Sequence, residues 1–134
     1  MSLTVVEALT AYAEMINTLD ASRLEPLLAD DFHYASQKVF HEMTSKAEYM
    51  EYIVGKLETF RGSGFEVWAE MGELTYAFPG PCVVLAQGER EELVAVLLAE
   101  VSGEYITRID MCVVPPPESA RRSGVYPGRS GLLK

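Results

Sequence analysis

The side chains that could carry acid–base chemistry are concentrated in the first third of this chain. His33 and His41 are its two histidines, and imidazole is the side chain whose charge changes between pH 5 and 8. They lie eight positions apart, no acid is placed to orient them, and their spacing misses metal patterns such as H-x-x-x-H. Solvated or hydrogen-bonded histidines are the simpler interpretation, and no metal ion is expected.

Hydroxyl groups near these histidines could donate hydrogen bonds to a bound molecule. Tyr12 lies in the first predicted helix, and Tyr34 and Ser36 lie in the first predicted strand. A buried tyrosine usually finds one hydrogen-bond partner, so Tyr12 is either a structural residue or a pocket donor. Arg108 and Asp110 share one face of a late strand and could form an ion pair there, unless a register change turns Asp110 toward a pocket.

Composition limits the classes of partner. The 134 residues are enough for one domain with a single core. A net charge of −9 argues against a nucleic-acid groove or an anionic membrane surface, and no apolar run of about 18 residues predicts a membrane span. Cys82 and Cys112 form neither a metal pattern nor a disulfide framework, so reduced core thiols in a cytoplasmic protein are expected. No dinucleotide fingerprint, phosphate-binding loop or nucleophile elbow is present, and no cofactor is expected.

Hydrophobic periodicity indicates the elements that must position these groups. Apolar residues at helical or alternating spacing, bounded by caps and turns, predict helices at 4–19, 22–28 and 46–60 and strands at 32–37, 65–78, 82–87, 92–101 and 104–114. Three helices with one early strand, followed by an antiparallel meander, predict an α+β fold. The helices should pack on one face of a strongly curved, mostly antiparallel sheet.

The second face of that sheet also needs a cover. Residues 92–101 are apolar on both faces, whereas an antiparallel strand normally alternates. A partner subunit is the simplest cover, so a homodimer is expected; the alternative is that the tail, residues 115–134, folds back over this face. From Glu118 the tail carries four basic residues against one acid, and the rest of the chain carries seven against nineteen. The tail therefore lies on the acidic body or a partner, or is a solvated, partly disordered end.

One stretch carries a family resemblance. Residues 16–34, INTLDASRLEPLLADDFHY, followed by a capped helix and a meander, resemble the NTF2-like (SnoaL-like) superfamily over residues 4–114, and within it a bacterial subgroup of unassigned function. The resemblance implies a cone of three helices on a bent sheet, with residues 115–134 as an added Pro- and Arg-rich tail. Such folds include isomerases, cyclases, dehydratases, small-molecule binders and non-catalytic dimer modules, so the fold alone does not give the function.

Ketosteroid isomerase is the best-known enzyme for comparison. It uses a carboxylate base, with an oxyanion hole made by a tyrosine and a protonated aspartic acid. Aligned without gaps, its oxyanion tyrosine falls on Tyr12, its base on Ser36 and its second oxyanion acid near Leu98. A serine hydroxyl cannot accept a proton near neutral pH unless another base activates it. The comparison implies a donor role for Tyr12 and excludes the steroid-isomerase chemistry in its usual form.

Side chains alternate between the two faces of a strand, and this strand parity adds residues to the candidate site. Tyr34 and Ser36 share parity with the missing base and should point into the cone, whereas His33 points away unless a bulge shifts the register. The candidate catalytic residues are Tyr12, Tyr34, Ser36 and His33. The candidate ligand pocket is formed by Tyr12, Tyr34, Ser36, Val94, Val96, Leu98, Ile109 and Met111.

The apolar walls of this pocket predict a small, mostly apolar ligand in the cone, and acid–base turnover of that ligand stays open. The alternative is a non-catalytic homodimeric structural or interaction module whose cone is filled by its own side chains. A cavity above roughly 300 Å³ between Tyr12 and the sheet separates the two hypotheses.

Overall fold

Two α-helices and a curved sheet of six strands make up the described part of this chain. A computed structural model describes residues 2–38 and 41–129. In chain order the elements are α1 (Val5–Thr18), the 3₁₀ turn η1 (Glu25–Leu27), β1 (Leu28–Ser36), α2 (Lys46–Ser63), β2 (Val67–Leu74), β3 (Gly80–Gln87), β4 (Leu93–Ser102), β5 (Tyr105–Cys112), η2 (Pro117–Ser119) and β6 (Arg121–Arg122).

Side-chain caps set where the helices begin. Thr4 Oγ1 accepts a hydrogen bond from Glu7 N at 3.0 Å, and the Glu7 carboxylate accepts one from Thr4 N at 2.8 Å, which is a full capping box. Ser45 caps α2 by accepting from Glu48 N at 3.1 Å. Gly64 ends α2 with a φ of 71°, a left-handed conformation that glycine adopts without strain.

The expected second helix is one 3₁₀ turn, so the prediction of three helices was wrong by one. Pro26 occupies the first turn of η1, and Leu28 is already extended and aligned with Ile106 of β5. β1 therefore begins four residues earlier than predicted. The strand predicted at residues 65–78 is also shorter, because β2 ends at Leu74 and a loop at residues 75–79 precedes β3.

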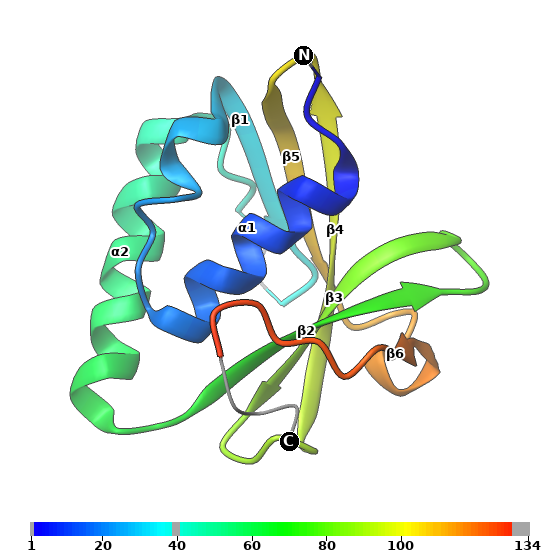
Figure 1. Ribbon diagram of the computed structural model, residues 1–134. Coiled ribbons are helices and arrows are strands. Elements are labelled where there is room, and N and C mark those ends of the chain that lie inside the picture. The colour runs from blue at the N-terminus through cyan, green and yellow to red at the C-terminus, as the bar shows by residue number, and fades with distance from the viewer. Residues whose placement is uncertain (1, 39–40, 130–134) are drawn as a thin grey trace.

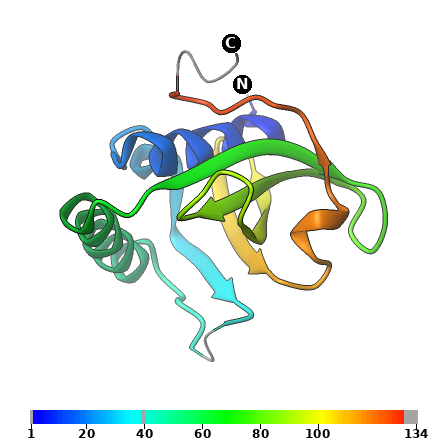
Figure 2. The same cartoon turned by 90° about the horizontal axis from the view of Figure 1, so that it is seen from below.

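The sheet has the strand order β1-β5-β4-β3-β2-β6. β1 runs parallel to β5, and the other neighbours are antiparallel, which confirms a mostly antiparallel sheet. α1 crosses in front of β4 and β5, and α2 runs alongside β1 (Figure 1). The hairpin of β2 and β3 bends away from β4 and β5 so that its loop projects to one side (Figure 2).

Each face of the sheet carries its own apolar cluster. The inner face packs on the helices, and its cluster includes Val83, Leu97 and Ile109. The opposite, outer face carries Leu74, Cys82, Val84, Val96 and Cys112, packed with Ala120 from the tail. The alternative in which the tail covers the second face of β4 therefore holds for this part of the sheet.

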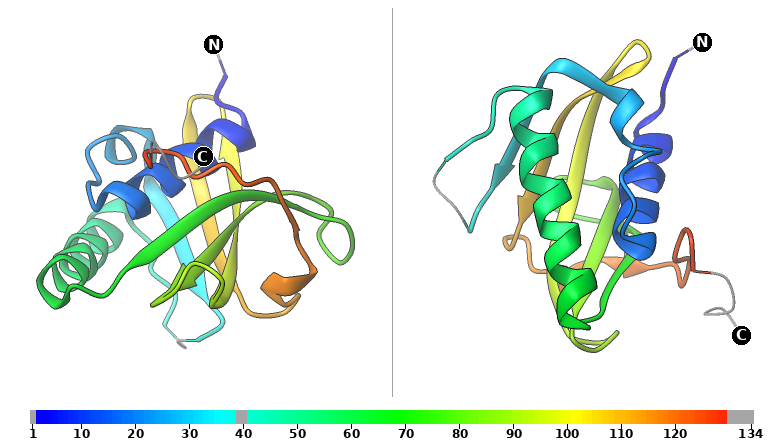
Figure 3. Two further views of the ribbon diagram at one scale, coloured as in Figure 1. Left: turned by 60° about the horizontal axis from the view of Figure 1, so that its bottom comes forward. Right: turned by 90° about the vertical axis from the view of Figure 1, so that its left-hand side faces the viewer.

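The described part of the tail lies on the acidic body of the same chain. Arg122 Nε lies 2.6 Å from the Glu70 carboxylate, which is 3% exposed, and Arg122 pairs with Gly72 on the free edge of β2. Further along, the Arg129 guanidinium lies 5.1 Å from the centre of the Trp68 ring. Figure 3 shows the tail crossing β2 near the end of α1. The boundary at residue 114 between domain and tail stays a prediction.

Candidate functional site

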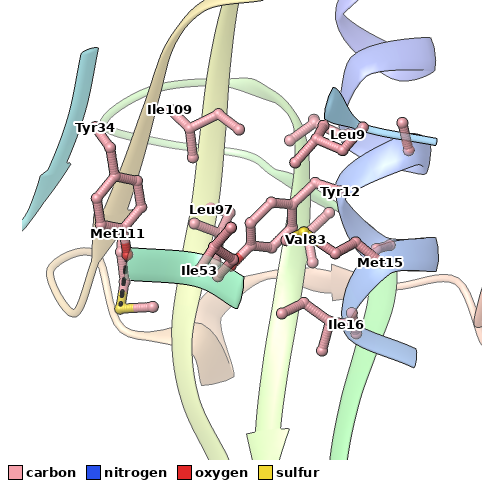
Figure 4. Packing of buried hydrophobic residues seen from close by; sticks show 14 of the residues in the cluster. Leu9, Tyr12, Met15, Ile16, Tyr34, Ile53, Val83, Leu97, Ile109 and Met111 are labelled. Atoms are coloured by element: carbon pink, nitrogen blue, oxygen red, sulfur yellow. Dashed lines mark hydrogen bonds between the residues drawn. The ribbon is translucent and has the colours of Figure 1, made fainter. Parts of the chain in front are cut away.

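Tyr12 and Tyr34 lie inside the cone; strand parity predicted this for Tyr34. Each is 2% exposed; Tyr12 points inward from α1, and Tyr34 reaches in from β1 (Figure 4). The Tyr34 hydroxyl donates to Met111 Sδ at 3.9 Å, and Ser36 Oγ donates to the same sulfur at 3.6 Å. Met111 thus occupies the space that a ligand would need beside these hydroxyls.

Burial decides what these phenols can do. Desolvation, with the neighbouring tyrosines Tyr49 and Tyr52, raises the pKa of Tyr12 well above its usual range. Desolvation also raises the pKa of Tyr34, with Tyr12 and Tyr52 adding to the effect. Both phenols stay protonated at neutral pH, so they can donate a hydrogen bond but cannot serve as bases.

Aromatic side chains fill the middle of the cone. The ring of Tyr49 lies 5.0 Å from Phe32 and 5.1 Å from Tyr34, and Tyr34 lies 5.8 Å from Tyr52, measured between centroids. The free space beside Tyr12 amounts to about 10 Å³, at the lower limit for one water molecule. The ligand cavity expected between Tyr12 and the sheet is therefore absent from the described residues.

Val94, Val96 and Leu98 of β4 were all predicted to line the cone. They do not lie on one face, because a bulge interrupts the strand at Val94. Leu85 pairs with Ala95 and Ala86 with Leu93, so Val94 is an extra residue opposite this step. Val94 packs against the inner cluster, whereas Val96 and Leu98 belong to the outer cluster. The assignment of Val96 and Leu98 to the cone was wrong.

In β4 the alternate residues Ala95 and Leu97 face the helices, and α1 contacts this strand. Ile109 and Met111 of β5 lie on the inner face as predicted, but they are packed in the core.

His33 lies on the outer face, where parity placed it, and joins an ionic network. Its Nδ1 lies 2.6 Å from Glu42 Oε2, and Arg108 NH1 lies 3.0 Å from the same oxygen. Arg108 also donates to both oxygens of Asp110, at 2.9 and 3.0 Å. The interpretation of Arg108 and Asp110 as a structural ion pair agrees with this geometry. His41 lies apart and pairs with Glu48 at 2.6 Å.

The network shifts the pKa values of two of its members, Glu42 and Arg108. Hydrogen bonds from His33 and Arg108 hold the pKa of the Glu42 carboxyl below its usual range. Hydrogen bonds to Asp110 and Glu42 raise the pKa of the Arg108 guanidinium. Glu42 accepts from both His33 and Arg108, so it is an orienting partner rather than a free base.

An open space lies on the outer face, where β3 diverges from β4 beyond the pair Val83 and Leu97. It is a groove of about 670 Å³, within the usual size range of ligand pockets. Its lining residues are Val5, Ala35, Ser36, Gln37, Phe78, Pro79, Gly80, Pro81, Leu98, Ala99, Glu100, Arg108, Asp110, Met111 and Cys112. Three residues predicted for the cone pocket, Ser36, Leu98 and Met111, border this groove, and Met111 also packs in the inner cluster.

The hairpin loop between β2 and β3 forms one wall of the groove. Phe78 is 57% exposed there, and its N–H donates to Tyr76 O at 2.8 Å across Ala77. Ala77 has a φ of 65°, which is rare and strained for a residue with a side chain. Backbone strain of this kind clusters at functional sites, so the loop conformation is an observation in favour of the groove.

Sequence reasoning missed this wall. Residues 79–81, Pro-Gly-Pro, were interpreted only as a turn, and Phe78 was placed in a strand. An exposed aromatic residue beside a proline-bounded turn was the available signal.

Neither a metal-binding cluster nor a membrane-spanning helix is found among the described residues. None of their His, Cys, Asp and Glu side chains gather in a group of three or more that could hold a metal ion. No helix within residues 2–38 and 41–129 is long and apolar enough to cross a membrane.

Solved structures resemble this chain in fold. An NTF2-like protein of unknown function from Cytophaga hutchinsonii matches at a TM-score of 0.57 and 12% identity, covering 86% of this chain and 96% of that one. A candidate polyketide cyclase from Sinorhizobium meliloti matches at 0.54 and 9%, covering 80% and 92%. A candidate isomerase from Rhodopseudomonas palustris matches at 0.53 and 13%, covering 83% and 90%. No protein-family model and no curated protein matches the chain.

Proposed function

Since this chain has the NTF2-like fold of its solved neighbours, we propose that it is a binding module for a small, mostly apolar molecule. The ligand occupies the groove on the outer face, and the cone serves as the packed core. One observation carries the proposal: the groove offers about 670 Å³, whereas the space beside Tyr12 offers about 10 Å³.

The lining supports the ligand class. Phe78, Pro79 and Pro81 form an apolar wall, and Leu98 and Cys112 supply an apolar floor. Polar groups gather at one side only, which would orient a ligand with one polar end.

Turnover is not part of the proposal. Tyr12 and Tyr34 are buried donors with raised pKa values, and Ser36 is bonded to Met111. His33 faces away from these hydroxyls, on the other side of the sheet, and is paired with Glu42. The four residues predicted to act together are therefore divided between the two faces, and a shared proton-transfer step has no common site.

A neutral apolar dye tests the proposal. N-phenyl-1-naphthylamine should bind saturably to the native protein, with a rise in fluorescence. Phe78→Ser should weaken this binding several-fold, because it removes most of the apolar wall that the loop presents. Phe65→Ser is the matched control: Phe65 is 50% exposed but lies outside the groove, so its loss should leave the affinity unchanged.

Variants of the cone complete this test. Tyr12→Phe and Tyr34→Phe should leave dye affinity unchanged, since neither hydroxyl borders the groove. Absence of saturable binding, or a loss caused by the cone variants and not by Phe78→Ser, would reject the proposal.

The second candidate is the non-catalytic homodimer module. The apolar rim of the outer face favours it: Tyr76 is 50% exposed, Phe78 57% and Val114 68%. A second copy would then cover the groove in place of a ligand. Sedimentation at micromolar concentration decides this point, because a dimer broken by Phe78→Ser supports the homodimer and a monomer rejects it.

A cytoplasmic setting belongs to the same proposal. Cys82 and Cys112 are both free and buried, and burial raises the pKa of the Cys82 thiol to about 11. Thiols that stay protonated and unpaired suit a reducing compartment.

A further inference from the structure

The polar side of the groove carries more acid than base. Arg108 is its one guanidinium, and the carboxylates of Glu42 and Asp110 already compensate that charge at 2.9 to 3.0 Å. An anion in the groove would therefore meet a guanidinium whose N–H groups already donate to two carboxylates. Arg108 therefore lines the groove as part of an ion-pair network, and its guanidinium is not free to bind a ligand.

Glu100 adds a carboxylate that does not pair with Arg108. It stands opposite Arg108 in the ladder between β4 and β5, and it borders the groove. Within the described part of the chain, no basic group lies within 4 Å of its carboxylate. It is exposed, so it can turn toward a ligand without breaking a contact of the fold.

A shallow hollow of about 270 Å³ continues from the groove past Glu100 and Arg108. Asp31, His33 and Thr107 complete its lining. Around Arg108 the outer face thus presents the carboxylates of Asp31, Glu42, Glu100 and Asp110 against one guanidinium and one imidazole. The field at this end of the groove favours a cation.

The opposite end of the groove is apolar. Phe78, held out by the strained backbone at Ala77, presents an exposed ring, and Pro79 and Pro81 lie beside it. An apolar end and an acidic end within one groove match a molecule with the same division.

We propose that the groove binds a small amphiphilic amine. The apolar body of the ligand lies between the hairpin loop and Leu98, and its ammonium group meets the carboxylate of Glu100 near Asp110. This inference rests on the proposed binding function of the same groove and adds the chemical class of the ligand.

Three probes of similar shape test the charge of the ligand directly. They are 2-phenylethylammonium, 2-phenylethanol and 3-phenylpropanoate, each titrated into the isotopically labelled native chain and followed by amide shifts. The ammonium compound should bind about two- to fivefold more tightly than the alcohol, as expected for one exposed ion pair. The carboxylate compound should bind most weakly, because the acidic end repels it.

Two glutamate variants locate the effect. Glu100→Gln should remove the advantage of the ammonium compound over the alcohol and leave the affinity for the alcohol unchanged. Glu51→Gln is the control, because Glu51 is an exposed acid of α2 outside the groove, and its loss removes the same negative charge as Glu100→Gln. This variant should keep the ammonium preference.

The outcomes separate the two proposals. Equal affinity for the ammonium compound and the alcohol, or a preference that survives Glu100→Gln, overturns the amine assignment and leaves the apolar groove standing. Failure of all three compounds to bind, the neutral one included, overturns the amine assignment together with the binding function.

Discussion

At the scale of single residues, the hydroxyl of Tyr49 stands out in the interior of the cone. Tyr49 is fully buried, and its hydroxyl has no hydrogen-bond partner in the described structure. Leaving a buried hydroxyl unpaired costs free energy, whereas its ring packs well against Phe32 and Tyr34. The ring and not the hydroxyl is what the fold requires at this position.

Tyr49→Phe should therefore raise the free energy of unfolding by roughly 0.5–2 kcal/mol, because it removes the unpaired group and keeps the ring. Urea denaturation followed by circular dichroism measures this change. Tyr34→Phe is the matched control: its hydroxyl contacts Met111, so its loss should be neutral or slightly destabilising. A destabilised Tyr49→Phe variant would show that the Tyr49 hydroxyl has a partner and contradict the account of the packed cone.

The sequence predicted the direction of the side chains better than it predicted the empty volume inside the cone. Tyr34 points into the cone and His33 points away, as strand parity required, and Tyr12 lies on the buried stripe of α1. The sequence could not show that Tyr49, Tyr52 and Met111 would fill the interior, because that depends on how α2 approaches β1. Volumes follow from tertiary packing, whereas parity follows from the local period of the strand.

At the scale of elements, the tail acts as a strap across β2. Arg122 meets buried Glu70 at 2.6 Å and exposed Glu91 at 2.6 Å, and Gly124 N donates to the second oxygen of Glu70 at 2.7 Å. Asn17 at the end of α1 donates to Ala69 O and Pro127 O, both at 2.8 Å. The strap therefore connects α1, β2 and the tail.

Arg122→Met should lower the free energy of unfolding by about 3–5 kcal/mol, because it leaves the buried carboxylate of Glu70 without its cation. The neighbouring residue gives the control. Arg121 pairs with Glu73 at 3.4 Å, and both side chains are more than half exposed, so Arg121→Met should cost less than about 1 kcal/mol. Equal effects of the two variants in urea denaturation would show that the strap does not depend on the buried pair.

Element order was largely predictable, and element bounds were less so. The start of α2 followed from the Ser45 cap, and the antiparallel ladders followed from strand alternation. The bulge at Val94 did not, because nothing in an unbroken apolar run of β4 marks the extra residue. That single residue turned Val94 to the inner face, whereas Val96 and Leu98 lie on the outer face because Ala95 and Leu97 face the helices.

At the scale of the whole molecule, the fold uses its two faces differently. The inner face, the helices and the aromatic cluster form a closed core, and the outer face remains open between the hairpin loop and β4. The resemblance to NTF2-like proteins is confirmed for the fold, with two helices and one 3₁₀ turn in place of three helices. The comparison enzyme suggested a site in the cone, but this chain has filled that volume with its own side chains.

The most direct measurement is a map of amide shifts when a neutral apolar probe, 2-phenylethanol, is titrated into the labelled chain. Our account predicts shifts at Gln37, Phe78, Leu98 and Asp110, which border the groove, with no change at Tyr12, Ile53 and Leu57 in the cone. Shifts confined to the cone residues, with the groove unchanged, would contradict it.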